Sequence, residues 1–474
     1  MSFLRRYYWG ILGLVLASYG LSLFHAYVGE EANYTIMSME MWQRQIFRSV
    51  VSLGGVGGRP PLYNWAMIPL AHWVVGWPRI LLAARLVTLG ATLGTALILA
   101  GWARALWPGV GAGKVAGLLY LVTADVLFYR GWLAYADPLF AFFMVLSAFL
   151  LWNAVQRRSL LCLFLSLLAI FASYLTKVMT AYAYYGGIWL VLLGQRSSRA
   201  FLWSRQAMGV YILGLLPMGL WLGTVGHQDT QQVTGQLADV SDKLLSADAL
   251  GTWLLKLGEF PLSILAGLLP SSLWALRGLV SQHRQGIPWP FPVKSLTAMA
   301  LLNFLPYWIA PHSAPRYVLP EYGLVVLVAT YYLTHEPALF QNGILRPERW
   351  VVGLALLGLG ISAVGYPLYQ QRVRGDDYAR MASQVEALAG PYPIYTLNWS
   401  SVGLSVVALI DSRHFDRPAI VSPPSCLTDG LVIAYTSHDL PGDGWAELEG
   451  QSEQLVLICR GKVCAAPFFH SGRP

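Results

Sequence analysis

Hydrophobic residues fall into long runs along the chain, separated by short polar segments. Eleven such runs, each near the roughly 20 residues that an α-helix needs to cross a bilayer, lie close to residues 7–27, 79–101, 111–129, 137–155, 159–177, 180–194, 207–225, 258–278, 293–310, 316–334 and 350–369. The pattern predicts an α-helical polytopic membrane protein with about eleven spans.

Basic residues gather in alternate connections between these runs. The residues that fall on one side are Arg5, Arg6, Arg104, Lys114, Arg157, Arg158, Arg196, Arg199, Arg205, Arg284, Arg346 and Arg349. The positive-inside rule places that side in the cytoplasm. We therefore expect the first outer loop (28–78), residues 130–136, residues 226–257 and everything after 370 to face outward. An odd number of spans puts the N-terminus in the cytoplasm and the C-terminus outside.

Composition supports a membrane protein and argues against a nucleic-acid-binding protein. Of the 474 residues, 56% are hydrophobic and 12% are charged, against about 25% charged in an average soluble domain. The net charge of +8 does not indicate nucleic-acid binding, because the arginines lie mostly in short loops where topology explains them. No cleavable signal precedes the first run, so we expect that run to remain as a span of the cytoplasmic membrane.

The first outer loop holds a dense cluster of charged residues beside the membrane. Residues Ile36 to Val50 show helical spacing of apolar positions, which predicts an amphipathic helix, either lying in the interface or packed on the bundle. The glycines of 54–58 predict a flexible or tightly turning linker. Pro60 and Pro61 then prevent a helix from including Arg59 and present its guanidinium.

Three further charged residues lie at the outer ends of predicted spans. Asp137 precedes Pro138, which suits either a helix cap or a contact with a ligand. Lys177 follows the fifth span, where a lysine either reaches the interface or meets an anion. Arg316 opens the tenth span from the same side.

The last hundred residues change in character. Short apolar runs at 393–397, 402–410, 431–435 and 455–459 alternate with Gly, Pro and Asp turns, which predicts a small soluble α/β domain over residues 371–474. Residues 1–370 form the membrane domain in this division. Cys459 and Cys464 are close enough in sequence to pair in an oxidising exterior, which would leave Cys426 unpaired.

Several of these motifs together resemble membrane glycosyltransferases of the GT-C fold, in particular the family of the protein O-mannosyltransferases and the lipid A aminoarabinose transferase. The family pattern has an acidic pair and a tyrosine in the first outer loop, a Lys-Pro-Pro-Leu-x-Tyr-Trp stretch, an Asp before the fourth span, Thr-Lys after the fifth and Arg-Tyr-Leu-Leu-Pro opening a late span. The matching segments here are Glu30 to Tyr34, Arg59 to Trp65, Asp137, Thr176-Lys177 and Arg316 to Pro320. Glu30 stands where the family has Asp, Asn33 where it has Arg, and Arg59 where it has Lys.

The resemblance implies transfer of a sugar from a polyprenyl-phosphate donor to a lipid, glycan or protein acceptor at the outer membrane surface. A lipid phosphate needs cations to hold its charge, and Arg59, Lys177 and Arg316 are the candidates. Glu30 is the candidate general base, and Asp137 is expected to position the acceptor or the sugar. Substrate-positioning roles fall to Glu31, Tyr34, Tyr63 and Tyr317. One base and one displacement predict inversion at the anomeric carbon.

Other interpretations remain open from sequence alone. Glu30 and Glu31 could be surface carboxylates paired with Arg44 or Arg59. Tyr63, Trp65, Trp73 and Trp77 could form an interfacial belt. The whole chain could be a transporter or flippase, or a non-catalytic assembly subunit with the same fold. No metal site is predicted, although a divalent cation would have a place if the acceptor were itself a phosphate.

Overall fold

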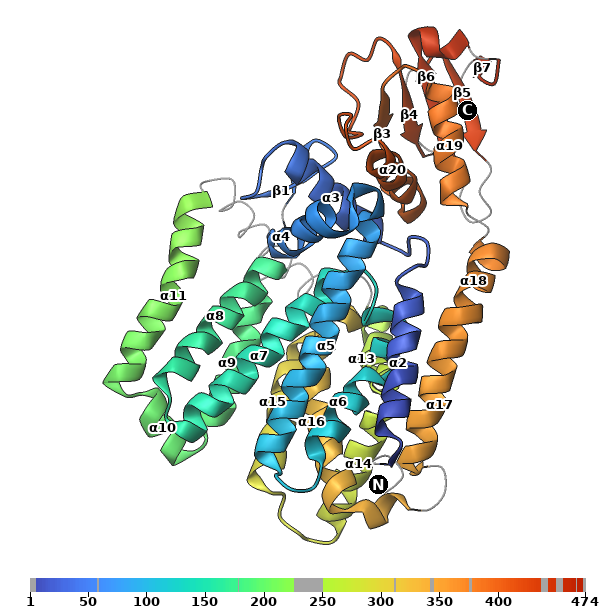
Figure 1. The fold of residues 1–474 in the computed structure, drawn as a ribbon. Coiled ribbons are helices and arrows are strands. Elements are labelled where there is room, and N and C mark those ends of the chain that lie inside the picture. Colours follow the sequence, from blue (N-terminus) through green and yellow to red (C-terminus); the bar gives the residue numbers. More distant parts are fainter. Residues whose placement is uncertain are drawn as a thin grey trace.

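The computed structural model describes residues 6–57, 59–177, 179–225, 250–310, 313–341, 345–374, 377–435, 442–448, 455–465 and 467–471. Long helices run side by side through one part of the molecule, and a small sheet with its helices caps one end of them (Figure 1). The helices of this bundle are α2 (Tyr8–Ser22), α5 (Ile80–Leu106), α6 (Ala112–Leu121), α7 (Ala136–Arg157), α8 (Leu160–Thr176), α9 (Thr180–Leu193), α11 (Arg205–Val225), α13 (Leu250–Gly267), α14 (Ser271–Arg284), α15 (Phe291–Ile309), α16 (Leu319–His335) and α17 (Pro347–Gly360).

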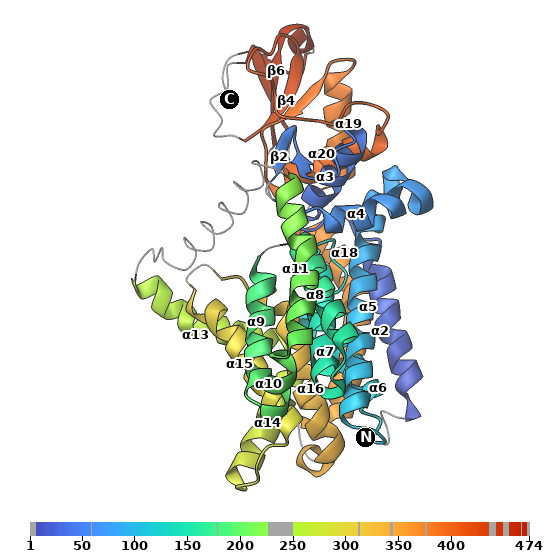
Figure 2. The same ribbon diagram turned by 90° about the vertical axis from the view of Figure 1, so that its left-hand side faces the viewer.

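Ten of the eleven predicted apolar runs fall mainly on one of these helices each, and the run near 258–278 is divided between α13 and α14. Among the described residues, five helices are long and apolar enough to cross a membrane by themselves, and six if one bent pair counts as a single span. The multi-pass membrane architecture is therefore confirmed, whereas the number of eleven spans stays a prediction. Helix α2 begins at the end of the bundle opposite the C-terminal sheet (Figure 2).

Burial separates central from peripheral helices. The apolar windows of α7 and of the helix Pro315–His335 are 72% and 78% buried within the protein, whereas the window of α11 is only 17% buried. Because lipid can cover apolar side chains as well as protein can, the exposed apolar face of α11 is typical of a span at the edge of a bundle.

The run near 258–278 is not the single straight span that was expected. The helices Trp253–Gly267 and Ser271–Arg284 meet at an angle of 105°. Pro270 sits in the break, where a proline removes a backbone donor and prevents a helix from continuing.

The first outer loop folds against the end of the bundle. Helix α3 (Glu31–Gln43) is followed by a hairpin of β1 (Val50–Ser52) and β2 (Gly55–Gly57), and then by α4 (Leu62–Pro69). The helix expected to reach Val50 was therefore predicted too long: it ends at Gln43, and Val50 begins a strand. The tightly turning alternative for the glycine segment is the observed one, since Leu53 and Gly54 both have positive φ in a two-residue turn.

Helix α3 is packed rather than interfacial. Ten of its thirteen residues are buried, including Glu40. Trp77 was a candidate for a membrane belt, but it stacks on Phe415 of the C-terminal part with ring centres 4.0 Å apart. Trp73, in contrast, is 74% exposed, as a belt residue would be.

The C-terminal part is an α/β unit with a five-stranded sheet, as predicted. Its strands have the order β3-β4-β6-β5-β7, with β3 (Ile394–Thr396) parallel to β4 (Gly430–Ala434) and the other neighbours antiparallel. The remaining elements are α19 (Tyr378–Ala389), α20 (Ser401–Arg413), β5 (Gly444–Leu448), β6 (Leu455–Arg460) and β7 (His470–Ser471). The apolar run 402–410 is thus the helix α20.

This C-terminal unit is tied to the first outer loop. The side chain of Gln43 donates to the carbonyls of Phe415 and Arg417 at 2.9 and 3.0 Å and accepts from the Ala419 amide. Figure 1 shows α20 directly over α3. Cys459 and Cys464 form a disulfide, which confirms the expected pairing, and Cys426 is free and exposed.

Candidate active site

The site begins where α3 starts. Glu30 is the residue before the helix, and its backbone N–H donates to the hydroxyl of Tyr135 at 3.0 Å. Gly29 has φ +59°, and a side chain there would clash with that hydroxyl, so this position requires glycine. Half of the Glu30 side chain is exposed, and its carboxylate lies 3.4 Å from Arg316 Nη1.

Arg316 comes from a segment far away in sequence, the turn Pro315–Val318 that leads into α16. Its Nε is buried and has no hydrogen-bond partner among the described residues. The Arg316 side chain is nevertheless 31% exposed beside the half-exposed Glu30 carboxylate, so its accessible N–H groups can donate to an anionic oxygen.

Asp137 and Lys177 form a second ion pair. Asp137 is 4% exposed and lies in the first turn of α7, where its side chain makes no capping hydrogen bond. Asp137 is thus in the first turn of its helix, as expected, and the hydrogen bond of its carboxylate is with the ammonium of Lys177 at the end of α8. The Lys177 ammonium also lies 4.6 Å from the centre of the Tyr317 ring.

The two ion pairs, Glu30–Arg316 and Asp137–Lys177, both lie near Tyr34. The Arg59 guanidinium carbon lies 5.3 Å from the centre of the Tyr34 ring, and Arg59 has no ion pair with any described carboxylate. The pKa of Tyr34 is raised to about 12, mainly by burial; among the neighbouring charges, Arg59 and Arg316 lower it, and Asp137 and Glu30 raise it. Glu30 and Asp137 also both act electrostatically on Arg316.

We call Glu30, Asp137, Arg59, Lys177 and Arg316 the charged cluster. It contains three cations and two carboxylates, so it carries one net positive charge at neutral pH. The five come from the first outer loop and from the ends of α7, α8 and α16, which the fold brings to the same end of the bundle. The cluster has the excess of positive charge that a phosphate needs.

Two predicted positioning residues are not part of this cluster. The Glu31 carboxylate is fully buried, and it accepts from Arg85 at 2.9 and 2.6 Å and from the backbone amides of Val28 and Ala134. The Tyr63 hydroxyl bonds to Thr88 and to the carbonyl of Ala84, both in α5. The Tyr63 ring packs against the Tyr34 ring with centres 5.2 Å apart. Glu31 and Tyr63 therefore stabilise the segments that carry the charged cluster.

The surface-pair alternative named the wrong partners. Arg44 lies near Glu40, not near Glu30 or Glu31. Sequence reasoning also missed Arg85, which is completely buried near the N-terminal end of α5. A lone arginine inside an apolar run was the available signal, because such a charge needs a partner in the membrane.

Metal ligands are not gathered in the described part of the chain. No three His, Cys, Asp or Glu side chains there could hold an ion together. The chemistry that these described residues offer is cation binding of an anion, together with a carboxylate that can accept a proton.

Comparison with known proteins bears on the fold. No family model matches the chain. It resembles the crystal structures of ArnT from Cupriavidus metallidurans in the apo state (TM-score 0.68, 13% identity, 96% of this chain and 98% of that chain) and bound to undecaprenyl phosphate (TM-score 0.68, 14% identity, 98% and 99%).

The chain has the GT-C fold of ArnT. The resemblance drawn from the sequence motifs is thereby confirmed at the level of fold. The chain is also 28% identical over 398 residues to the undecaprenyl phosphate-alpha-4-amino-4-deoxy-L-arabinose arabinosyl transferase of Pseudomonas aeruginosa, across 76% of this chain. The match spans 65% of that relative's length.

Proposed function

We propose that this chain is an integral membrane glycosyltransferase that moves a sugar from a polyprenyl-phosphate donor to a lipid, glycan or protein acceptor. The observation that carries the proposal is the convergence of three cations and two carboxylates at one end of a membrane bundle. The ArnT fold and the relative named for an undecaprenyl-phosphate sugar support the class of donor.

Each cation has a distinct place in the reaction. Arg316 offers a partly exposed guanidinium, and Arg59 offers a planar fork that forms no ion pair with any carboxylate in the described part of the chain, so these two bind the donor phosphate. Lys177, which is paired with Asp137, adds a third positive charge. Together they stabilise the negative charge that grows on the phosphate oxygen as the bond to the sugar breaks.

The two carboxylates differ in solvent exposure, and their proposed roles differ accordingly. Glu30, half exposed and 3.4 Å from its cation, accepts the proton of the acceptor hydroxyl. That oxygen forms a bond to the anomeric carbon while the bond to the phosphate oxygen breaks, and the polyprenyl phosphate leaves with the electron pair. Asp137, almost fully buried against Lys177, orients the ammonium. A single displacement inverts the anomeric centre.

We also propose the location of these parts. Residues 1–370 form the transferase domain in the cytoplasmic membrane, the N-terminus is cytoplasmic, and residues 371–474 form a domain on the outer side. The basic connections of the sequence support this orientation. The disulfide in the C-terminal unit supports it as well, because disulfides persist in oxidising compartments.

The test is transfer by the purified full-length protein in lipid nanodiscs. Labelled polyprenyl-phosphate sugars are supplied with membrane lipids as acceptors, and release of polyprenyl phosphate is measured. We expect Glu30→Gln to lower the rate by about 10²–10⁴-fold, as for loss of a general base. Glu447→Gln, at an exposed position on β5, is the matched control and should transfer at the normal rate.

Two results would overturn the proposal. One is movement of intact sugar lipid across the membrane without bond cleavage, which describes a transporter. The other is transfer that is equally fast in the wild type, Glu30→Gln and Arg316→Gln.

A further inference from the structure

A separate cavity of about 550 Å³ lies beside the charged cluster. We call it the tyrosine cavity. It is lined by Val28, Gly29, Tyr129, Ile361, Gly365, Tyr366, Tyr369 and Gln370. Its volume is within the range of about 300–1,000 Å³ for ordinary small-molecule sites.

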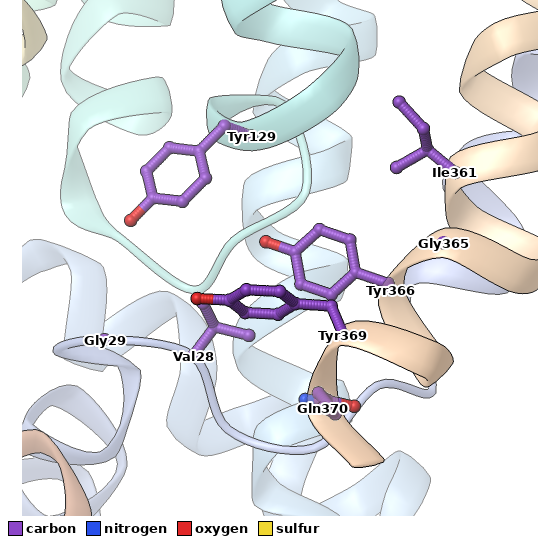
Figure 3. Close-up of a pocket in the computed structure, with 8 residues that line it drawn as sticks. All are labelled: Val28, Gly29, Tyr129, Ile361, Gly365, Tyr366, Tyr369 and Gln370. Carbon is purple, nitrogen blue, oxygen red and sulfur yellow. The ribbon is translucent and has the colours of Figure 1, made fainter. Parts of the chain in front are cut away.

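The cavity has walls from three segments. Val28 and Gly29 lie just before α3, Tyr129 lies in the π-helical turn Val126–Arg130, and the other residues come from the end of the last span, residues 361–370. Figure 3 shows the rings of Tyr366 and Tyr369 extending from that last span toward Val28, with their hydroxyl groups pointing the same way. The cavity therefore lies at the end of the bundle against which the first outer loop packs.

The lining combines aromatic faces with neutral hydrogen-bonding groups. It contains three tyrosines and one carboxamide, and none of its eight residues is charged. A sugar ring presents C–H groups on its faces and hydroxyls around its edge, so tyrosine rings and a glutamine side chain match both parts. Tyr369 is 49% exposed, which leaves ring surface for such a partner.

A phosphorylated group fits this lining poorly. None of the lining residues is a cation, and Arg130, which follows the lining residue Tyr129, has its Nε bound to Asp125 at 2.6 Å. A phosphate in the cavity would thus have no unpaired cation from the lining, and an unpaired buried charge is strongly unfavourable. The charged cluster has the opposite character, with its three cations.

The cavity is connected to the proposed base through Gly29 and Tyr135. Gly29 lines the cavity and directly precedes Glu30, and the Tyr135 hydroxyl accepts the Glu30 N–H at 3.0 Å. The Tyr129 and Tyr135 rings have centres 6.3 Å apart. The cavity and the proposed base are therefore neighbours in the fold, joined by Gly29 and by the Tyr135 hydroxyl that packs against it.

We propose that the tyrosine cavity binds an uncharged sugar ring of the acceptor, so that the acceptor is a glycan or glycolipid whose receiving sugar carries no phosphate. This inference rests on the proposed function and deepens it. The two sites bind different substrates. The cations of the charged cluster bind the donor phosphate, and the tyrosines of the cavity bind the neutral acceptor sugar.

Binding can be measured independently of transfer. The full-length protein in nanodiscs is mixed with matched pairs of probes, namely glucose, mannose, galactose and N-acetylglucosamine, each with its 6-phosphate. Saturation transfer to the sugar protons is recorded by NMR. We expect at least one neutral sugar to give a signal several-fold stronger than its phosphate, and that signal to fall at least fivefold in Tyr369→Ala.

Further variants separate stacking from folding. Tyr369→Phe keeps the ring and should retain most of the signal, whereas Phe468→Ala, at an exposed aromatic position in the C-terminal unit, should leave it unchanged. In transfer assays Tyr369→Ala should raise the KM for the acceptor at least fivefold while release of sugar to water from the donor stays normal.

The inference is overturned if none of the neutral sugars binds, if the phosphates bind equally well or better, or if Tyr369→Ala leaves the signal intact. Saturation transfer to the acyl protons of a short-chain phosphatidylcholine, with none to any sugar, would identify a lipid site instead. If the protein fails to cleave the donor at all, the proposed function fails, and the binding experiment still reports on the cavity.

Discussion

Arg85 is the residue whose removal should disturb this protein most. Its Nε and Nη2 donate to Glu31 at 2.9 and 2.6 Å, and its remaining hydrogen bonds reach the carbonyls of Ser22, Leu23, His25 and Ala26. One buried guanidinium thus joins the end of α2, the start of α3 and α5.

Replacement by leucine removes this cation and leaves the Glu31 carboxylate buried. Breaking a buried ion pair from one side costs about 3–5 kcal/mol, because the remaining charge is uncompensated. We therefore expect Arg85→Leu to lower the free energy of unfolding by about that amount. Arg85→Lys keeps the charge but has three donors in place of five, so its cost should be intermediate.

The assay is equilibrium unfolding in mixed micelles, followed by tryptophan fluorescence. Arg79→Leu, at an exposed arginine six residues earlier in the chain, is the control and should stay within about 0.5 kcal/mol of the wild type. The double variant Glu31→Gln/Arg85→Leu should be less destabilised than the sum of its single variants.

Transfer by the folded fraction should also fall, because the start of α3 carries Glu30. A cost below about 1 kcal/mol for Arg85→Leu, or strict additivity in the double variant, would refute the view that this pair organises the site.

Two further predictions concern other buried carboxyl groups. Asp137→Asn should lower kcat/KM at least tenfold and raise the KM for the donor, because Lys177 loses the group that orients it. Asp137→Glu should recover part of the activity. Unchanged donor titrations in Asp137→Asn would contradict this role. The pKa of Asp411 is raised from 3.8 to about 8, mainly by burial, with a smaller increase from the nearby Glu40 and a decrease from the Ile420 N–H hydrogen bond. The folded state then binds this proton more tightly than the unfolded state, so stability should fall as pH rises from about 4 to about 8, by up to about 1.4 kcal/mol per pH unit. Asp411→Asn should flatten that slope in unfolding measurements at stepped pH, and an equally steep slope in the variant would show that other groups are responsible.

The positions of the helices were predictable because bilayer thickness and backbone hydrogen bonding act locally. An apolar run of about 20 residues has few alternatives to a helix in lipid, and every predicted run is helical, although the run near 258–278 forms two helices. The break near Pro270 was also visible in the sequence as a proline, but the 105° bend depends on how the two halves pack.

The first outer loop was harder to predict for a related reason. Apolar residues at helical spacing between Ile46 and Val50 are equally consistent with a short strand, since so few residues do not distinguish the two periods. Pairing with Gly55–Gly57 decided the outcome. Glu40 is likewise buried because α3, the helix that carries it, packs against α20 of the C-terminal unit.

The sequence by itself determined that this is a multi-span membrane protein with a small α/β unit, and it identified the residues of the charged cluster as candidates. Only the tertiary structure decided which charges are partners. Arg316 and Glu30 are separated by 286 positions, and no local pattern relates them. Glu31 and Glu30 are adjacent and chemically alike, yet one is buried against Arg85 and the other is half exposed, because the helix start turns successive side chains toward different surroundings.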